Sequence, residues 1–232
     1  MRNIAIITAR SGSKGLKDKN IKELCGKPLL AYSIECALKS KKFGKVFVST
    51  DSSHYARIAE KYGADASFLR TAENSGDKSG SWDAVREVVD KFEEKKEFFD
   101  NIMLLQPTSP LRTEEDICNC FALMEEKGAN AVISVCETDH SPLWCNTLQD
   151  DLCMDDFQNE KYFGLPRQAL PTYYRINGAV YLLTREELNQ SPMFRHRCYA
   201  YIMPHERSID IDTEFDFKIA EVFMKERSEV HG

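Results

Sequence analysis

The sequence lacks the features that mark several large classes of protein. None of its eight cysteines belongs to a CxxC pair, and the closest two, Cys118 and Cys120, would lie on different faces of a helix. A zinc centre and a disulfide framework are therefore not expected. No apolar run is long enough to cross a membrane or to form the core of a signal peptide, and low-complexity tracts are absent. We expect a folded cytoplasmic protein without membrane contact, whose thiols are reduced and mostly buried.

The chain is acidic overall, but its N-terminal segment is basic. The 232-residue chain has a net charge of −6, which argues against a general nucleic-acid or membrane-surface binder. Residues 1–27 nevertheless contain seven basic and two acidic side chains, a local charge of +5 that leaves −11 for the remainder. This contrast predicts that an anion binds near the basic segment.

Short, continuous apolar runs alternate with amphipathic helical patterns along most of the chain. Runs of this kind are typical of strands covered on both faces, and they occupy residues 4–7, 46–49, 102–105 and 131–135. Helical patterns occupy residues 29–38, 56–62, 82–92 and 114–127, and the first of them places Leu30, Ile34 and Leu38 on one face. The alternation predicts an α/β fold with a parallel sheet. Further strands at residues 178–183 and 199–203 and a closing helix at 213–227 complete this expectation.

The alternation stops between about residues 140 and 174. This stretch is rich in proline, aspartate and glutamine, and its apolar residues follow no regular period. It is either a disordered insert or an arm that packs against a second subunit. Its aromatic side chains are costly to leave in water and favour the arm; they include Trp144, Phe157, Tyr162 and Phe163. Since a typical domain has about 150 residues, the length fits one domain with this excursion.

The first candidate site follows the first expected strand, because ligands of open α/β sheets bind beyond the carboxyl ends of strands. Two glycines and two serines free backbone amides there, and Arg10, Lys14 and Lys19 supply positive charge. This combination suits a polyphosphate. The segment matches neither GxxxxGK[ST] nor GxGxxG, so an ATPase or a dehydrogenase of those types loses its main support. A solvated lysine-rich loop is the alternative.

A pair of carboxylates forms the second candidate site. Asp210 and Asp212 are two positions apart, so in an extended segment both point to one side. Such a pair, completed by substrate phosphates, suits Mg²⁺. Alternatively, Asp212 caps the last helix, where Thr213 and Asp216 have the spacing of a capping box.

Two further segments carry polar side chains next to expected strands. Gln106 lies in a turn fixed by two prolines at the end of a strand, and this turn is either a binding element or a purely structural one. Arg167, Arg175 and Asn177 flank the strand after the insertion. They can bind a carboxylate or phosphate through paired contacts, or form surface ion pairs.

In combination, these segments resemble the CMP-sialic acid synthetases, also called acylneuraminate cytidylyltransferases. The resemblance runs from residue 4 to about residue 220 and rests on four motifs in the same order. The motifs are Ala9-Arg10-x-x-Ser13-Lys14-Gly15 with Lys19-Asn20, Leu104-Leu105-Gln106-Pro107-Thr108-Ser109-Pro110-Leu111-Arg112, Arg175-x-Asn177-Gly178-Ala179, and Ser208-Ile209-Asp210-Ile211-Asp212-Thr213.

The resemblance implies a three-layer, Rossmann-like α/β nucleotidyltransferase with a mostly parallel sheet and helices on both faces. Residues 1–232 would form a single cytidylyltransferase domain, in which the insertion at about 140–174 is a small dimerisation arm of a homodimer. The implied reaction transfers CMP from CTP to the anomeric hydroxyl of a nine-carbon 2-keto acid sugar, releases pyrophosphate and requires Mg²⁺. Neither nucleic acid nor a membrane is an expected partner.

The resemblance also implies roles for individual positions. The nucleotide-binding positions are Arg10, Lys14, Lys19, Asn20, Arg70 and Ser81. The sugar-binding positions are Gln106, Arg167, Arg175, Asn177, Tyr181 and Phe194, with Arg167 delivered by the arm of the neighbouring subunit. Asp210 and Asp212 match the metal-binding pair and, with Arg10 and Lys19, are the catalytic candidates. Because these motifs contain no histidine, Asp212 bound to the metal, or the metal itself, is our candidate for removing the hydroxyl proton.

Two departures from the family pattern fall on the acceptor side. Trp144 stands where relatives often have a lysine, and only Phe194 remains of a pair of phenylalanines found in some relatives. The acceptor is therefore N-acetylneuraminic acid or a modified acid such as legionaminic or pseudaminic acid. The rival hypotheses are a synthetase for the eight-carbon acid KDO, a sugar-nucleotide sensor without chemistry, and an RNA-binding module. The acidic remainder of the chain and the lack of an RNP-like aromatic pattern argue against the last.

Overall fold

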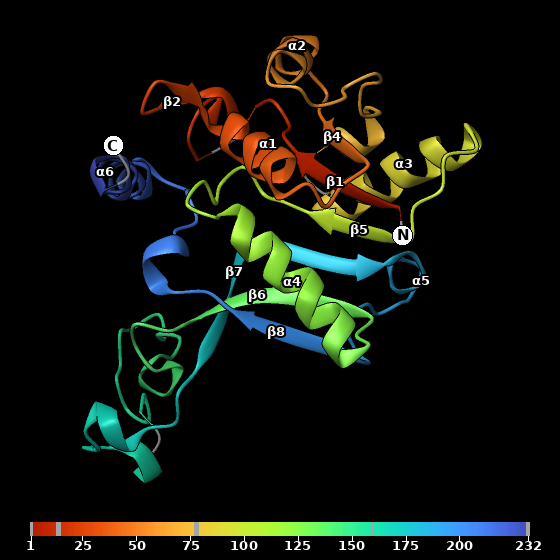
Figure 1. Ribbon diagram of the computed structural model, residues 1–232. Coiled ribbons are helices and arrows are strands. Elements are labelled where there is room, and N and C mark those ends of the chain that lie inside the picture. Colours follow the sequence, from red (N-terminus) through yellow and green to blue (C-terminus); the bar gives the residue numbers. More distant parts are fainter. Residues whose placement is uncertain (1, 13–14, 77–78, 159, 231–232) are drawn as a thin grey trace.

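A six-stranded sheet forms the centre of the molecule (Figure 1). The computed structural model describes residues 2–12, 15–76, 79–158 and 160–230. β7 is antiparallel to both of its neighbours, whereas the other adjacent strands pair in parallel. A mostly parallel sheet is thus confirmed. The strand order is β4 (Lys45–Ser49), β1 (Asn3–Thr8), β5 (Asn101–Leu104), β7 (Tyr174–Thr184), β6 (Ala131–Glu137) and β8 (Cys198–Ile202).

The helices lie close to their expected positions. α4 begins with the expected capping box, in which the backbone N–H of Asp116 donates to Thr113 Oγ1 at 3.2 Å and that of Thr113 donates to Asp116 Oδ2 at 2.9 Å. Gly128 ends this helix with a φ of 55°, a conformation that favours glycine. The helices are α1 (Leu29–Ser40), α2 (Ser53–Lys61), α3 (Ser81–Glu94), α4 (Glu114–Lys127), α5 (Arg185–Leu188) and α6 (Glu214–Val230).

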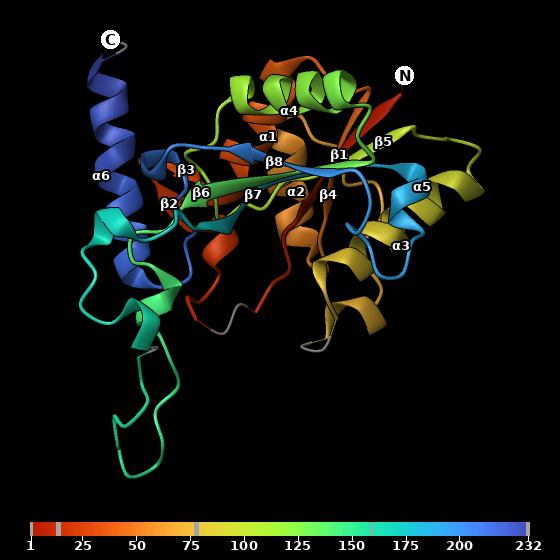
Figure 2. The ribbon, with the colours of Figure 1, turned by 90° about the horizontal axis from the view of Figure 1, so that it is seen from below.

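The sheet is covered on both faces, which produces three layers (Figure 2). Ala5 and Ile7 of β1 face a core shared with α1, α2 and α4. Ile4 and Ile6 face the opposite core, which α3 and α5 complete. Because alternate side chains of a strand point to opposite faces, this two-sided burial explains why the strand sequence is apolar throughout.

Two expectations about burial are wrong in detail. Leu38 is 43% exposed, because it lies in the last turn of α1 beside Gly63, which has no side chain to cover it. All eight cysteines are free, but only three are buried. Cys25 is exposed in the turn between β2 (Glu23–Leu24) and β3 (Lys27–Pro28), and Cys145 is exposed in the insertion.

A third, smaller core joins the two ends of the chain. Phe217 and Ala220 of α6 pack with Leu24, Leu29 and Ile211. This packing places the segment before α6 against the loop region that follows β1. Residues from the basic N-terminal segment and from the acidic C-terminal segment are thereby brought together.

The insertion extends away from the sheet (Figure 1). Between residues 140 and 173, its described part contains only loops and short 3-10 turns, at Pro142–Trp144, Glu160–Tyr162 and Arg167–Ala169. Phe163 is 73% exposed, although it is a large apolar side chain. None of the helices in the described ranges is both long and apolar enough to span a bilayer.

Candidate active site

A cavity of about 740 Å³ lies at the edge of the sheet where β1, β4 and β5 end. This is the edge at which ligands bind in open α/β sheets. Side chains from distant parts of the chain line it together. Of the sequence-predicted residues, those that line the cavity are Arg10, Lys19, Asn20, Arg70, Ser81, Gln106, Asp210 and Asp212.

The loop after β1 is held in place from several directions. Asp51, which follows β4, accepts hydrogen bonds from the backbone N–H and the hydroxyl of Ser11 at 2.7 and 2.8 Å. The buried side chain of Asn20 donates to the carbonyl of Arg10 at 3.0 Å. Asn20 thus supports the loop through one amide hydrogen, and it also lines the cavity. Ser13 and Lys14 lie outside the described residues.

Lys19 connects this loop to the segment before α6. Its ammonium donates to the carbonyl of Ile211 at 2.6 Å and to Asp212 Oδ1 at 2.9 Å. The Lys19 side chain is only 13% exposed, whereas that of Asp212 is 75% exposed. A Cβ on Gly15 would lie 2.8 Å from the carbonyl oxygen of Asp212, so the close approach of the two segments depends on glycine here.

Two arginines supply further positive charge. Arg70 Nε and Nη2 donate to Ser49 Oγ and to its carbonyl at 3.1 and 2.7 Å, which fixes the guanidinium at the end of β4. Burial lowers the pKa of Arg70, while the nearby Asp51 and Glu87 act in the opposite direction. Arg10 Nη1 donates to the carbonyl of Gly76 at 3.4 Å.

The turn after β5 is fixed by a buried arginine. Arg112 donates to the carbonyls of Gln106 and Ala179 at 3.4 and 2.5 Å, and to Ser33 Oγ at 2.5 Å. Ser33 Oγ in turn donates to the Gln106 carbonyl at 3.2 Å. The backbone of Gln106 is therefore rigid, and its side chain points toward Gly178, where an added Cβ would lie 2.5 Å from Gln106 Oε1.

The two aspartates fit a divalent cation. Asp210 Oδ1 is buried and has no hydrogen-bond partner among the described residues. Burial raises the pKa of Asp210, and Asp212 adds to this, whereas Thr108, Lys19 and Arg175 lower it. A buried, unpartnered carboxylate oxygen beside a second carboxylate suits Mg²⁺, which is typically held by one or two carboxylates plus substrate phosphates. Within the described ranges, no group of three or more acidic, histidine or cysteine side chains forms a metal cage.

The capping alternative is settled by the hydrogen bonds at the start of α6. Asp216 Oδ2 accepts from the backbone N–H and the hydroxyl of Thr213, both at 2.8 Å, and Thr213 Oγ1 accepts from the N–H of Asp216 at 3.3 Å. Thr213 and Asp216 therefore form the predicted box. The carboxylate of Asp212 takes no part in this box and contacts Lys19 at the cavity instead.

Of the sequence-predicted residues that the structure describes, five do not line this cavity. Asn177 is buried, and its amide makes four hydrogen bonds, with Ser134, Ala179, Ser208 and Met203. It fills an irregularity in the β6–β7 pairing and has no hydrogen-bonding capacity left for a ligand. Arg175 Nη2 donates to the carbonyl of Ser208 at 3.1 Å.

The remaining three are two aromatic residues and an arginine of the insertion. Tyr181 and Phe194 pack around Trp82, with ring centroids 5.7 and 5.3 Å from it. This aromatic cluster adjoins the cavity through Ser81, the neighbour of Trp82. Arg167 lies on the insertion, which extends away from the sheet.

Several cavity residues were not singled out from the sequence. Thr108 and Pro107 lie in the turn that was predicted for Gln106, so their position was visible but their role was not. Ser79 and Gly80 precede α3 and carry no signal beyond a helix start. Thr8, Gly15 and Thr213 also line the cavity. The sequence places Gly15 in the anion-binding loop and Thr213 in the capping box, whereas Thr8 carries no signal.

Comparison with known proteins identifies a family and several relatives. The family described as "Cytidylyltransferase" matches residues 4–227. The chain is 38% identical over 219 residues to an N-acylneuraminate cytidylyltransferase of Escherichia coli O18:K1:H7, covering 94% of the chain and 51% of that protein. It therefore spans about half the length of this relative.

Two shorter relatives match over nearly their full length. A CMP-N,N'-diacetyllegionaminic acid synthase of Legionella pneumophila is 33% identical, with 97% of each chain covered. A pseudaminic acid cytidylyltransferase of Campylobacter jejuni is 30% identical, again with 97% of each covered. Among solved structures, CMP:2-keto-3-deoxy-manno-octonic acid synthetase complexed with CTP has a TM-score of 0.73 at 17% identity, covering 98% of this chain and all of that one. This likeness shows the fold.

Proposed function

Because the chain belongs to the cytidylyltransferase family, we propose that it transfers CMP from CTP to the anomeric hydroxyl of a nine-carbon 2-keto acid sugar and releases pyrophosphate. The observation that carries this proposal is the meeting of cations and carboxylates in one cavity. Lys19, Arg10 and Arg70 line the same cavity as Asp210 and Asp212, at the end of the parallel strands. This arrangement suits a triphosphate with a divalent cation.

The cavity residues have separate roles in the proposed reaction. The sugar hydroxyl attacks the α-phosphorus in line with the departing pyrophosphate, so negative charge increases on the phosphate oxygens. Lys19 and Arg10 offset this charge and orient the triphosphate. A bound Mg²⁺, held by Asp210 and Asp212, would supply further charge neutralisation. The exposed carboxylate of Asp212 accepts the hydroxyl proton.

The acceptor belongs to the nonulosonic acids in this proposal. Gln106 lines the cavity next to Gly178, and Trp82, Tyr181 and Phe194 offer an apolar surface nearby. N-acetylneuraminic acid is supported by the name of the relative at 38% identity. Legionaminic or pseudaminic acid is the second candidate, because the relatives named for these acids match over 97% of their own length. KDO has weaker support, since that likeness is one of fold at 17% identity.

The protein acts as a homodimer in this proposal. Large apolar side chains remain exposed on the insertion and at the adjacent start of β7, among them Phe163, Tyr174 and Ile176 at 73, 49 and 57%. Exposed apolar area of this kind is typical of an interface. The arm would carry Arg167 to the cavity of the second subunit.

The test is an acceptor panel. The purified protein is incubated with CTP, Mg²⁺ and, separately, N-acetylneuraminic, legionaminic and pseudaminic acids and KDO, and pyrophosphate release is followed. We expect rapid release with one nonulosonic acid and little with KDO. CTP binding without release on any acid would favour a sensor and contradict the proposed reaction.

A further inference from the structure

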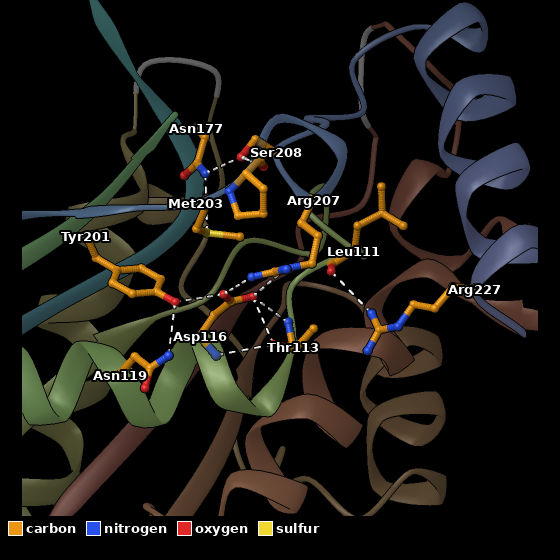
Figure 3. Close-up of polar contacts among 11 residues, drawn as sticks. Leu111, Thr113, Asp116, Asn119, Asn177, Tyr201, Met203, Arg207, Ser208 and Arg227 are labelled. Carbon is orange, nitrogen blue, oxygen red and sulfur yellow. Dashed lines mark hydrogen bonds and ion pairs between the residues drawn. The ribbon is translucent and has the colours of Figure 1, made fainter. Parts of the chain in front are cut away.

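An ion pair lies directly before the segment that carries the two aspartates (Figure 3). Arg207 Nη2 donates to Asp116 Oδ1 at 2.7 Å, and Arg207 Nε donates to Asp116 Oδ2 at 3.3 Å. Arg207 ends the 3-10 turn His205–Arg207, three positions before Asp210. The pair therefore joins the start of α4 to the polypeptide that leads into the cavity.

The side chain of Asp116 is held in one position by burial and hydrogen bonds. Its side chain is fully buried. Besides Arg207, its carboxylate accepts hydrogen bonds from the hydroxyl of Tyr201 at 3.0 Å and from the backbone and side chain of Thr113 at 2.9 and 3.0 Å. With five donors around two oxygens, the carboxylate cannot turn, and it holds the forked guanidinium in one orientation.

The residues after Arg207 are held just as closely. The hydroxyl of the buried Ser208 accepts from Asn177 Nδ2 at 2.9 Å and donates to the carbonyl of Pro204 at 2.8 Å. Farther along, the N–H of Ile211 donates to the carbonyl of Thr108 at 2.9 Å. The aspartates thus lie on a short strap, residues 208–212, which Arg207 fixes at its start. The strap is held again at Ile211 and at its last residue, Asp212, whose N–H donates to Asp216 Oδ2 at 3.1 Å.

We propose that Arg207 and Asp116 are positioning residues for the divalent-cation site, which they serve by fixing the strap so that the carboxylates of Asp210 and Asp212 meet in the cavity. This inference rests on the proposed function. It also assigns a use to Asn177, which holds the strap at Ser208 instead of touching the sugar. Groups that orient metal ligands through the surrounding structure commonly tune metal affinity.

A role in helix capping alone does not account for the pair. The box at the start of α4 needs only the contacts between Thr113 and Asp116, and Arg207 takes no part in it. An ion pair with a buried carboxylate is also a weak source of stability, because desolvation offsets much of the attraction between the charges. The geometry instead supports a role of the ion pair in holding the strap in one conformation.

The test uses the full-length Arg207→Gln variant and two measurements. The first is hydrogen exchange of the free protein, in which the peptide covering residues 208–213 should exchange faster than in the wild type while β1 and β5 are unchanged. The second is Mn²⁺ binding in the presence of CTP, followed by electron paramagnetic resonance. We expect the Mn²⁺ dissociation constant to rise about 10-fold or more. Arg207→Lys keeps the positive charge but loses the two-pronged guanidinium contact. Its Mn²⁺ dissociation constant should lie between those of the wild type and Arg207→Gln. This variant replaces Arg207→Gln if the latter does not fold.

Two control variants separate positioning from stability. Thr184→Ala removes the side-chain cap of α5, where Thr184 Oγ1 accepts from the N–H of Glu187 at 3.2 Å, and leaves all contacts of Asp116 and Arg207 in place. Glu93→Gln breaks a second forked ion pair, in which Arg185 contacts Glu93 at 2.6 and 3.1 Å away from the cavity. Both variants should lower thermal stability without changing Mn²⁺ affinity.

The outcomes distinguish this inference from the function on which it rests. A wild type that binds no Mn²⁺ in the presence of CTP would overturn the proposed metal-dependent function. Normal wild-type binding together with unchanged Mn²⁺ affinity in Arg207→Gln would overturn only the positioning role. Unchanged exchange of residues 208–213 in the variant would overturn it as well.

Discussion

The ammonium nitrogen of Lys19 lies 2.9 Å from Asp212 Oδ1, across 193 positions of sequence. The basic segment after β1 and the acidic segment before α6 thus meet at the cavity. In the proposed function, a triphosphate that enters the cavity would compete with Asp212 for Lys19, and the released carboxylate would then be free to bind a cation. In the absence of a ligand, the ion pair holds the two segments together.

Replacing Lys19 with methionine removes the charge and keeps most of the side-chain volume. We expect kcat/KM for CTP to fall about 100-fold, because a charged donor to the reacting phosphates is lost. Lys22→Met is the matched control, since Lys22 links the same two segments through Glu214 at 2.6 Å but does not line the cavity. Steady-state pyrophosphate release measures both. Equal losses in the two variants would show that Lys19 only joins the segments.

Asp212→Asn tests the cation site directly. We expect turnover to fall about 100-fold or more at saturating CTP, because metal ligation contributes several kcal/mol to such reactions. Removal of divalent ions with a chelator should abolish wild-type activity, and added Mg²⁺ should restore it. Glu214→Gln, an exposed carboxylate in the same segment, should behave like the wild type. Near-normal turnover of Asp212→Asn at saturating Mg²⁺ would contradict the assigned role.

Much of the fold was predictable because its signals are local. Continuous apolar runs indicated the buried strands. The spacing of acidic residues after Thr113 and Thr213 indicated the two capping boxes. The reversal of β7 was not predictable, because it depends on how the chain returns from the irregular insertion. The burial of individual thiols also depends on tertiary neighbours, as the exposed Cys25 shows.

The candidate site was predictable where the type of a residue, such as its charge, already indicates the ligand it binds. Lys19, Asp210 and Asp212 carry the charges that a site for phosphate and a divalent cation requires, and the structure brings them together. Asn177 shows the limit of this reasoning. Its sequence context is the same whether its amide binds a ligand or the protein, and only the three-dimensional structure reveals that Ser134 and Ser208 use it.

Gly178→Ala should impair the acceptor end of the cavity. The added Cβ would lie 2.5 Å from Gln106 Oε1 and 3.5 Å from Asp210 Oδ2, so Gln106 must move. We expect the KM for the acceptor to rise about 10- to 100-fold, as small displacements of positioning groups are costly. Gly26→Ala is the control, because its φ of +79° is close to the +75° of Gly178 but nothing lies within 4 Å of the new Cβ. A similar loss of activity in both variants would attribute the effect to backbone strain alone.

Glu87 should make stability depend on pH. Burial raises the pKa of Glu87, but hydrogen bonds from Lys91, Asn74 and Thr71 outweigh it and hold the pKa below its ordinary value. Because the folded pKa is the lower one, the stabilisation is present above about pH 4.3 and is lost as the pH falls below it. Glu87→Gln should therefore lower the free energy of unfolding by about 2 kcal/mol at pH 7.

Urea denaturation at several pH values measures this effect. The difference between wild type and Glu87→Gln should shrink as the pH falls from about 4 toward 2. Glu94→Gln, on the exposed side of the same helix, should differ little from the wild type at any pH. A difference for Glu87→Gln that stays constant down to pH 2 would show that the charge of Glu87 is not the cause.

The proposed dimer predicts that two inactive variants restore each other. If the arm delivers Arg167 to the second subunit, Lys19→Ala inactivates the cavity of its own protomer. Arg167→Ala instead inactivates the cavity of the partner protomer. A mixed dimer then has one cavity with both residues intact. After random exchange of subunits, half of the dimers are mixed, so about a quarter of the wild-type activity should return. Native mass spectrometry establishes that mixed dimers form, and mixed dimers without recovered activity would show that each cavity uses the Arg167 of its own chain.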